Sequence, residues 1–290
     1  MPKLKLGLPK GSLEAATFNL FGQAGWTIRS RTRNYFPTID DDEISCALVR
    51  AQEMGTHVGD GVLDVGITGI DWLIETESDV ERVCDLVYSK ASDAPSRWVL
   101  VVDRDSPVRA VEDLRGKRIA TELVGFTRRY LADKNVEAEV QFSWGATEAK
   151  VVEGMADAAV EITETGSTIR AHGLRIVCDV LHTYPVLAAN REALADPWKK
   201  AKIDQIALLL TSALAARNKA LLKMNVPAAA MEAVVALLPS LNAPTVSPLS
   251  DEKWLAVETV VDRDLVRDLV PRLRAEGAEG ILELDLKKIC

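Results

Sequence analysis

Short apolar runs alternate with glycine-containing turns and amphipathic stretches along the first part of the chain. Residues 3–8 alternate lysine and leucine, which predicts a strand, and the turn at residues 9–12 leads into a predicted helix over residues 13–24. Ser12 stands where it can cap that helix. Residues 44–49 and 63–68 predict two more strands, each followed by a polar segment. Open α/β sheets bind ligands at the carboxyl ends of their strands, so these turns are candidate sites.

A second α/β segment begins near residue 98. Residues 98–103 are almost all apolar, as expected of a strand buried on both faces. The pattern predicts further strands at the end of residues 114–121 and over residues 138–144 and 156–162, with helices between them. Residues 180–189 predict extended chain crossing back to the first segment. Pro197 then opens a long helix that is expected to end near Ala216.

The last part of the chain has a different order of predicted strands and helices. Strands are predicted over residues 220–225, 245–247, 254–261 and 280–284, and helices over residues 227–237 and 264–276. This β-α-β-β-α-β order is typical of a small ferredoxin-like domain. We therefore expect an α/β protein with one domain over residues 1–95 and 185–216, a second over 96–184, and the ferredoxin-like domain over 217–290. The two larger domains resemble the halves of a periplasmic binding protein.

Composition and charge exclude several classes of function. The 290 residues are 48% hydrophobic and 27% charged, which is an ordinary globular balance, and the net charge is −8. Residues 1–216 carry −7 of that charge, so a bound anion must be held by a local site, and nucleic-acid or membrane-surface binding is not expected. No apolar run is long enough for a membrane span, and the first residues lack the apolar core of a secretory signal.

The cysteines and histidines do not suggest a metal site. Four widely spaced cysteines and three histidines form neither a zinc-ligand spacing nor a disulfide framework. The expectation is a cytoplasmic protein with free thiols.

The strongest chemical signal lies between residues 157 and 169. A predicted buried strand ends in Glu161 and Glu164, and the loop Thr165–Thr168 then starts a helix. Gly166 allows close approach to a ligand, and hydroxyl and N–H groups at the positive end of a helix dipole suit a phosphate. Carboxylates beside a phosphate can bind paired ribose hydroxyls. The segment predicts a sugar-phosphate site; the alternative is that Glu164 and Thr165 merely begin and cap a helix.

This segment resembles the signature of ATP phosphoribosyltransferase, the first enzyme of histidine biosynthesis. The matching residues, at the signature's spacing, are Glu148, Gly154, Ala156, Asp157, Thr165, Gly166 and Thr168. The chain departs from the signature at Ala159, at Ile169 and at Glu161, where an Asp is usual. Residues 8–12, 64–71 and 114–121 resemble the family's opening loop, its second glycine loop and the start of its second domain. The resemblance covers the whole chain, including the ACT-like domain of the long form.

The resemblance implies that adenine N1 of ATP attacks C1 of phosphoribosyl pyrophosphate and that pyrophosphate leaves. Glu161 and Glu164 are then expected to bind the ribose hydroxyls and to stabilise positive charge on the ring. Mg²⁺ is expected to bridge pyrophosphate oxygens with few protein ligands. The residues expected to hold the 5-phosphate are Thr165, Gly166, Ser167 and Thr168.

Candidate ATP-binding residues follow the first strands. Lys10 is the leading candidate for contact with the pyrophosphate or triphosphate and for a catalytic role, with Gly11 beside it and Arg50 as the next cation. Gly69 and Asp71 are expected to orient the nucleotide. Weaker cationic candidates are Lys117, Arg118, Arg128 and Arg129, and neither His172 nor His182 is assigned a role.

The last domain is expected to regulate the enzyme. Residues 241–247 resemble the family's histidine-binding stretch, which suggests Leu241, Ala243 and Thr245 as effector contacts. Asn225 takes a place often filled by an acid and is the fourth candidate. The alternative is that this domain only assembles subunits. The resemblance further implies dimers and hexamers, for which residues 198–216 offer a packing face.

Three other interpretations stay open from the sequence. The first is a small-molecule binding protein of the periplasmic-binding fold without catalysis, which would need no acid pair. The second is a phosphoribosyltransferase of base salvage, against which the first two loops argue. The third is a stand-alone amino-acid sensor, which would not require the sugar-phosphate loop.

Overall fold

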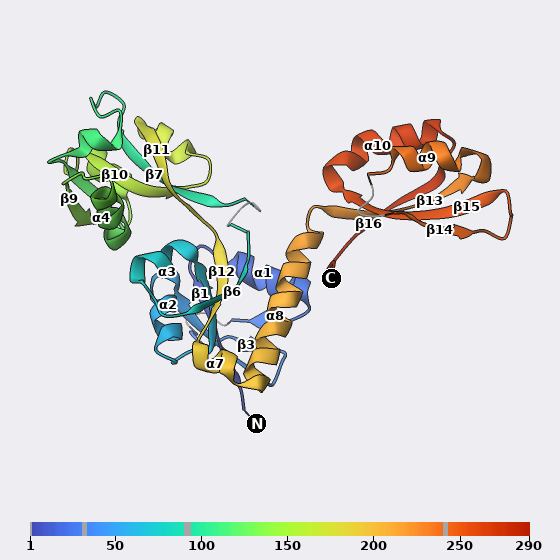
Figure 1. The fold of residues 1–290 in the computed structure, drawn as a ribbon, viewed down its shortest axis with the longest axis horizontal. Helices are drawn as coiled ribbons and strands as arrows, with labels where there is room; N and C mark the ends of the chain where they lie inside the picture. The colour runs from blue at the N-terminus through green and yellow to red at the C-terminus, as the bar shows by residue number, and fades with distance from the viewer. Residues whose placement is uncertain (1, 31–33, 90–93, 240–242) are drawn as a thin grey trace. The chain divides into compact units, whose positions relative to one another are not determined.

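A computed structural model of the chain describes residues 2–30, 34–89, 94–239 and 243–290. The chain forms two compact units, Met1–Ala207 and Leu208–Cys290, whose helices and strands are labelled in Figure 1. The boundary between the units lies inside a long helix, α8 (Pro197–Ala216), which has the bounds predicted from the sequence. A short helix, α7 (Arg191–Ala195), precedes it, capped by the Asn190 side chain.

No helix of the described residues is long and apolar enough to span a membrane.

The first sheet of the first unit has the strand order β4-β1-β5-β12-β6. β1 runs parallel to β4 and β5, whereas β12 runs antiparallel to β5 and β6. Its strands are β1 (Leu4–Lys10), β4 (Ile44–Arg50), β5 (Val65–Gly69), β6 (Glu81–Asp85) and β12 (Pro185–Ala189). The associated helices are α1 (Glu14–Ala24), α2 (Ala51–Gly59) and α3 (Ile70–Thr76), and a small pair is formed by β2 (Ile28–Arg29) and β3 (Thr38–Ile39).

The second sheet of this unit has the strand order β11-β7-β10-β8-β9. β10 pairs in parallel with β8 and antiparallel with β7, so this sheet is also mixed. Its strands are β7 (Ser96–Asp103), β8 (Arg118–Thr121), β9 (Glu139–Phe142), β10 (Ala158–Thr163) and β11 (Leu174–Thr183). The helices are the short 3-10 helix η1 (Val111–Leu114), α4 (Val124–Asp133), α5 (Thr147–Val152) and α6 (Ser167–Ala171).

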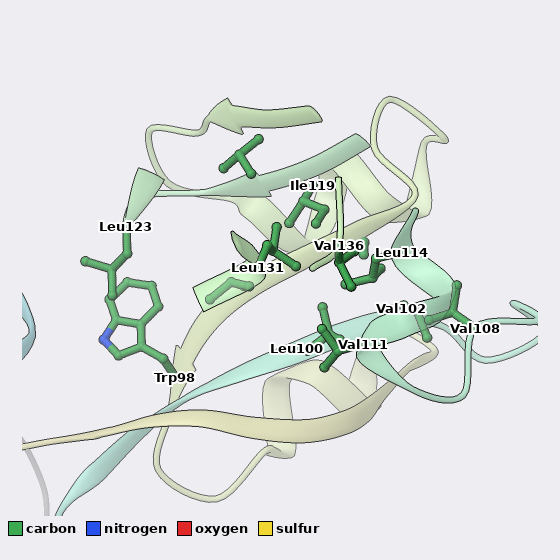
Figure 2. Close-up of a cluster of buried hydrophobic side chains, with 13 residues drawn as sticks. Trp98, Leu100, Val102, Val108, Val111, Leu114, Ile119, Leu123, Leu131 and Val136 are labelled. Atoms are coloured by element: carbon green, nitrogen blue, oxygen red, sulfur yellow. The ribbon is translucent and has the colours of Figure 1, made fainter. Parts of the chain in front are cut away.

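β7 is buried on both faces, as its apolar run predicts. Trp98, Leu100 and Val102 pack on one face into the cluster drawn in Figure 2, while Val99 and Val101 belong to a cluster on the other face. Burying one such side chain contributes about 1.5–3 kcal/mol, so these two clusters fix this inner strand of the sheet firmly. The loops at its edge therefore have a rigid base.

Residues 180–189 cross between the two sheets, as predicted, but as two strands and not one extended piece. β11 ends at Thr183 in the second sheet and β12 starts at Pro185 in the first. Tyr184 lies between them, and its carbonyl accepts a hydrogen bond from the Ile70 N–H at the start of α3. Tyr184, where the chain crosses between the sheets, is thus hydrogen-bonded to the segment that follows the carboxyl end of β5.

Side chains of the first sheet's helices also bind the second sheet's elements. The Glu75 carboxylate at the end of α3 accepts hydrogen bonds from the N–H groups of Gly125 and Phe126, at 2.8 and 2.7 Å. These N–H groups lie in the first turn of α4 and have no partner within their own helix, so Glu75 caps it. Arg129 of α4 in turn donates to the Ile74 carbonyl of α3.

The second unit contains a four-stranded antiparallel sheet in the order β14-β15-β13-β16. The predicted β-α-β-β-α-β sequence of elements is confirmed. The strands are β13 (Lys219–Pro227), β14 (Thr245–Pro248), β15 (Trp254–Asp262) and β16 (Glu279–Asp285). The helices are the short 3-10 helix η2 (Ala228–Ala230), α9 (Met231–Leu237) and α10 (Arg263–Ala275), and they pack on one face of the sheet through a cluster that includes Val234, Leu269 and Val257.

Two local predictions differ from the structure. The helix after the first turn starts at Glu14, whose N–H bonds the Gly11 carbonyl at 3.1 Å, and Ser12 does not cap it. The expected cap is wrong because the turn places Leu13, not Ser12, at the cap position. β6 was not predicted because its residues are mostly polar and exposed, which hides the strand alternation.

Candidate active site

A cavity of about 870 Å³ in the first unit gathers residues from both sheets. It brings together nine of the predicted site residues: Lys10, Gly11, Arg50, Gly69, Asp71, Glu164, Thr165, Ser167 and Thr168. Glu161 and Gly166 are not part of the lining, although they belong to the same segment as Glu164. Residues that the sequence did not single out also line the cavity: Gln52, Trp72, Tyr88, Ser89, Trp98, Glu122, Ile162, Thr183 and Tyr184.

Two cations stand side by side at the carboxyl edge of the first sheet. Lys10 ends β1 and Arg50 ends β4, and the register of this parallel pair places the two residues directly opposite each other. Both are exposed and both line the cavity. Like charges opposite each other destabilise a sheet, so this pair is best explained by an anionic ligand that neutralises both.

Glycines shape the turns at this edge. Gly11 has a φ of +108°, which side-chain-bearing residues rarely adopt, so the turn after Lys10 depends on it. Gly69 has an ordinary φ, but a Cβ there would collide with the Asp71 carboxylate. Glycine at this position thus lets the start of α3 lie against the end of β5.

Asp71 lies on the cavity wall but is only 2% exposed. One of its carboxylate oxygens accepts a hydrogen bond of 2.7 Å from the Trp98 indole N–H, which joins α3 to β7 of the second sheet. Burial raises the pKa of Asp71, against the lowering effect of hydrogen bonds from Trp98, Thr183 and the Trp72 backbone. The predicted contact with a nucleotide stays a prediction, and the structure adds a role in holding the two sheets together.

The Thr165–Thr168 loop is ordered by its own hydroxyl groups. Thr165 Oγ1 lies 3.0 Å from Ser167 Oγ and accepts a weak hydrogen bond from the Ser167 N–H at 3.3 Å. Gly166 has a φ of +73° and donates its N–H to Thr163 Oγ1 at 2.9 Å. The helix that follows, α6, has only five residues, so its dipole adds little, and the exposed hydroxyls are the main groups that can bind a phosphate.

Glu161 lies outside the cavity lining and is hydrogen-bonded to Thr147 at the start of α5. It shares the β10 face with Ala159, and its carboxylate accepts a hydrogen bond from the Ile162 N–H at 3.0 Å. Burial, reinforced by the negative charge of Glu148, raises the pKa of Glu161 from 4.5 to about 7, while the Thr147 hydroxyl opposes the shift. The Glu161 carboxyl group therefore keeps its proton to a higher pH than a solvent-exposed glutamate does.

Comparison with known proteins identifies the family. Residues 50–212 match the family model of ATP phosphoribosyltransferase, and residues 216–288 match the model named HisG, C-terminal domain. The chain is 62% identical over 286 residues to the ATP phosphoribosyltransferase of Nitratidesulfovibrio vulgaris, which covers 99% of this chain and 98% of that protein. The protein of the same name from Geotalea uraniireducens is 59% identical with the same coverage. The chain belongs to the ATP phosphoribosyltransferase family.

Solved structures agree with this membership. An ATP phosphoribosyl transferase (HisG:HisZ) complex from Thermotoga maritima matches with a TM-score of 0.61 and 25% identity, over 72% of this chain and 98% of that one. The periplasmic aliphatic sulphonate binding protein SsuA from Escherichia coli matches with a TM-score of 0.50 and 18% identity, over 74% of this chain and 73% of that one. The second match shows a shared fold alone. The predicted fold class is confirmed, and a binding protein without catalysis is not favoured.

The weaker cationic candidates of this family member lie outside the cavity lining. Arg118 pairs with Asp157 at 3.2 Å, and Arg129 pairs with Glu77 at 3.2 Å. Arg128 donates to the Val140 carbonyl. Arg118 and Arg128 thus bind partners of the second sheet, and Arg129 links α4 to the end of α3. Lys10 and Arg50, by contrast, form no ion pair with any described residue.

One missed cavity residue had a signal in the sequence. Glu122 directly follows β8, so it lies at the carboxyl end of a strand. Open α/β sheets bind ligands at these ends, which is the reason that Lys10 and Arg50 were candidates, and it applies equally to Glu122. Its carboxylate lies 3.5 Å from the Gln52 amide of α2. Tyr88, whose hydroxyl is 2.6 Å from the buried Thr17 hydroxyl, had no such signal because its partner is 71 residues away.

The predicted effector residues of the second unit are only partly brought together. Asn225 lines a cavity of about 240 Å³ with Leu249, Ser250, Asp251, Trp254 and Glu279. Thr245 and Ala243 are exposed and are not in this lining, and Leu241 lies outside the described residues. Glu279 is the register partner of Asn225 on β16, so acidic side chains stand beside the neutral amide.

The raised pKa of Glu161 predicts a pH-dependent stability that Glu161→Gln abolishes. The folded protein holds this proton up to about pH 7 and the unfolded chain releases it near pH 4.5, so the wild type loses stability as pH rises through that window. We expect the stability of the variant relative to the wild type to increase by about 2.5 kcal/mol between pH 5 and pH 8 in urea unfolding, since one pKa unit corresponds to about 1.4 kcal/mol. Exposed Glu153→Gln is the control, and an equal difference between wild type and Glu161→Gln at both pH values contradicts the assignment.

Proposed function

We propose that the cavity of the first unit is where this member of the ATP phosphoribosyltransferase family joins phosphoribosyl pyrophosphate to ATP. The reaction of the family forms the bond between adenine N1 and ribose C1, releases pyrophosphate and begins histidine biosynthesis. The observation that carries this placement is the pairing of Lys10 with Arg50 across the cavity from the Thr165–Thr168 loop. A pair of cations and a hydroxyl-rich loop give one cavity two separate places for phosphate groups.

The reaction requires alignment of two polyanions more than covalent participation of the protein. In our proposal the loop Thr165–Thr168 binds the 5-phosphate, and Glu164 on the cavity wall binds the ribose hydroxyls and stabilises positive charge that develops at C1. Glu161, on the strand that leads into the loop, is the second carboxylate that this proposal assigns to the ribose hydroxyls. Lys10 and Arg50 bind the triphosphate or the departing pyrophosphate, where negative charge accumulates.

The requirement for Mg²⁺ also belongs to the proposal. Among the described residues, no group of three or more His, Cys, Asp or Glu side chains is arranged to hold a metal ion. Two carboxylates on the cavity wall, those of Glu122 and Glu164, fit an ion that keeps mostly substrate and water oxygens as ligands. When bound, Mg²⁺ would neutralise charge on the pyrophosphate.

Formation of the N1-alkylated adenine tests this function directly. The protein is mixed with ATP, phosphoribosyl pyrophosphate and Mg²⁺, with pyrophosphatase present to remove the product that drives the reverse reaction. We expect the ultraviolet absorbance of an N1-substituted adenine to appear only when both substrates are present. Absence of this product from folded protein would contradict the proposed reaction.

We further propose that the cavity at Asn225 binds histidine as a feedback inhibitor. An amino-acid effector needs an anionic partner for its ammonium group, and Asp251 and Glu279 supply carboxylates in the cavity lining beside Asn225. This arrangement supports effector binding even though residue 225 is neutral. The formation of dimers and hexamers and a cytoplasmic location are proposals that rest on the family membership.

Glu279→Gln is expected to weaken inhibition by histidine while leaving the uninhibited rate unchanged. Removing a charged partner of the effector's ammonium group should raise the half-inhibitory histidine concentration by about tenfold, because a charge-assisted hydrogen bond contributes about 1.5–3 kcal/mol. The matched control is Glu283→Gln on the same strand, outside the cavity lining. Unchanged inhibition of Glu279→Gln in steady-state assays would place the effector elsewhere.

A further inference from the structure

Both cavity cations lie over aromatic rings. The Lys10 ammonium is 3.8 Å from the centre of the Tyr35 ring, and the Arg50 guanidinium is 5.4 Å from the centre of the Trp144 ring. A ring attracts a cation through its quadrupole and carries no net charge. These contacts therefore hold the two cations in place. A carboxylate partner would neutralise the cation, but a ring does not, so the full positive charge stays available to an anion.

The contact between Arg50 and Trp144 joins the two sheets. Arg50 ends β4 of the first sheet, and Trp144 lies in the loop between β9 and α5 of the second. The Trp144 side chain is 65% exposed, which is unusual for the largest apolar residue. The centre of the Phe142 ring, itself 54% exposed, lies 5.6 Å from the centre of the indole.

The loop that carries Trp144 is held in shape by buried groups. The Thr147 hydroxyl donates to the buried Ser143 hydroxyl at 3.1 Å, closing the loop at its base. Ala146 has a φ of +48°, a conformation that residues other than glycine adopt at a cost. These two features fix the backbone of the loop, so the position from which the Trp144 side chain extends is defined.

We propose that Trp144 is a positioning residue that aims the Arg50 guanidinium at the phosphates of the anionic substrate. This inference rests on the proposed function, since it takes the cavity to bind a triphosphate or pyrophosphate. Without the ring, the long Arg50 side chain loses a contact that restricts its rotamers, while the repulsion by Lys10, its cross-strand neighbour, remains. Trp144 acts through Arg50 and does not itself contact the substrate.

Calorimetric binding of Mg²⁺-pyrophosphate and of Mg²⁺-ATP to the full chain tests this proposal. We expect Trp144→Leu to weaken both probes by about fivefold, in line with a cation–π contact, and Trp144→Phe to retain most of the affinity because the ring is kept. Arg50→Met and the double variant Arg50→Met/Trp144→Leu should have the same affinity as each other for each probe, since the ring has no effect without its cation. In steady-state assays Trp144→Leu should raise KM for ATP by a similar factor and leave kcat within twofold.

Three results would overturn the proposal: unchanged binding by Trp144→Leu, a loss confined to ATP, which would indicate stacking of the base on the indole, or additive losses in the double variant. Trp198→Leu, at the start of α8 and outside the cavity lining, is the matched control. Pyrophosphate binding is measured without turnover. If no product forms but the effects of the Arg50 and Trp144 substitutions on pyrophosphate binding are coupled, the proposed reaction is rejected and the positioning role stands. If product forms normally but Trp144→Leu binds pyrophosphate as the wild type does, the positioning role is rejected and the reaction stands.

Discussion

Lys10→Met is expected to lower kcat/KM by about 10²–10³-fold, because it removes a positive charge from the place where negative charge accumulates in the transition state. Lys10 is exposed at the end of β1 and touches Tyr35 through its ammonium group, so the substitution should leave the free energy of unfolding within about 0.5 kcal/mol. Its removal also relieves repulsion with Arg50. The measurement is the steady-state rate of product formation at varied ATP and phosphoribosyl pyrophosphate.

A second lysine–aromatic pair provides the control for this variant. Lys134, at the end of α4, lies 5.1 Å from the centre of the Tyr130 ring and is not part of the cavity lining. Lys134→Met removes the same charge and a similar contact, and it is expected to retain the wild-type rate. Equal activity of Lys10→Met and the wild type would remove Lys10 from the site.

Thr165→Ala is expected to raise KM for phosphoribosyl pyrophosphate by about 10–100-fold, because a hydrogen bond to a charged phosphate contributes about 1.5–3 kcal/mol. The variant also loses the hydroxyl that accepts the Ser167 N–H and contacts its side chain, so the rest of the loop is less well oriented. Thr165 is exposed, so thermal unfolding should change little. Steady-state kinetics with saturating ATP measure the effect.

Thr38→Ala is the matched control for Thr165→Ala. Thr38 is an exposed threonine of β3, its hydroxyl donates to the Arg29 carbonyl at 3.4 Å, and it does not line the cavity. Its kinetics should equal those of the wild type. If Thr165→Ala shows wild-type KM for phosphoribosyl pyrophosphate, the loop does not bind the 5-phosphate.

The cation pair shows what the sequence could predict. Lys10 and Arg50 each follow a strand with a clear apolar alternation, and the carboxyl ends of parallel strands share one edge of a sheet. The strand predictions thus placed both residues at that edge, and the register of β1 with β4 then makes them neighbours. The glycine and threonine loop was equally visible because its residues are adjacent in the chain.

Partners that are distant in the chain could not be predicted. The pKa of Glu161 depends on which β10 face its side chain takes and on Glu148 of α5, which packs there only after folding. Asp71 is buried beside Trp98, a residue 27 positions away that donates a hydrogen bond to it. The ring of Trp144 reaches Arg50 from the other sheet, and no local pattern marks an exposed tryptophan as a partner of that arginine.

In the second unit, too, the local elements could be predicted from the sequence and the contacts between distant residues could not. Its order of strands and helices followed from the hydrophobic pattern, whereas Asn225 is a candidate through the family resemblance, since it takes a place often filled by an acid. The acids beside it, Asp251 and Glu279, come from a turn and from β16, so their grouping around Asn225 depends on the pairing of β13 with β16.

The central claim is that one cavity of the first unit binds phosphate groups at two places. A crystal structure of the protein with phosphoribosyl-ATP tests it most directly, because this product carries both a 5-phosphate and a triphosphate. We predict the 5-phosphate on the hydroxyls of Thr165–Thr168 and the triphosphate within hydrogen-bonding distance of Lys10 and Arg50. A product bound outside this cavity, or a triphosphate that contacts neither cation, would contradict the account.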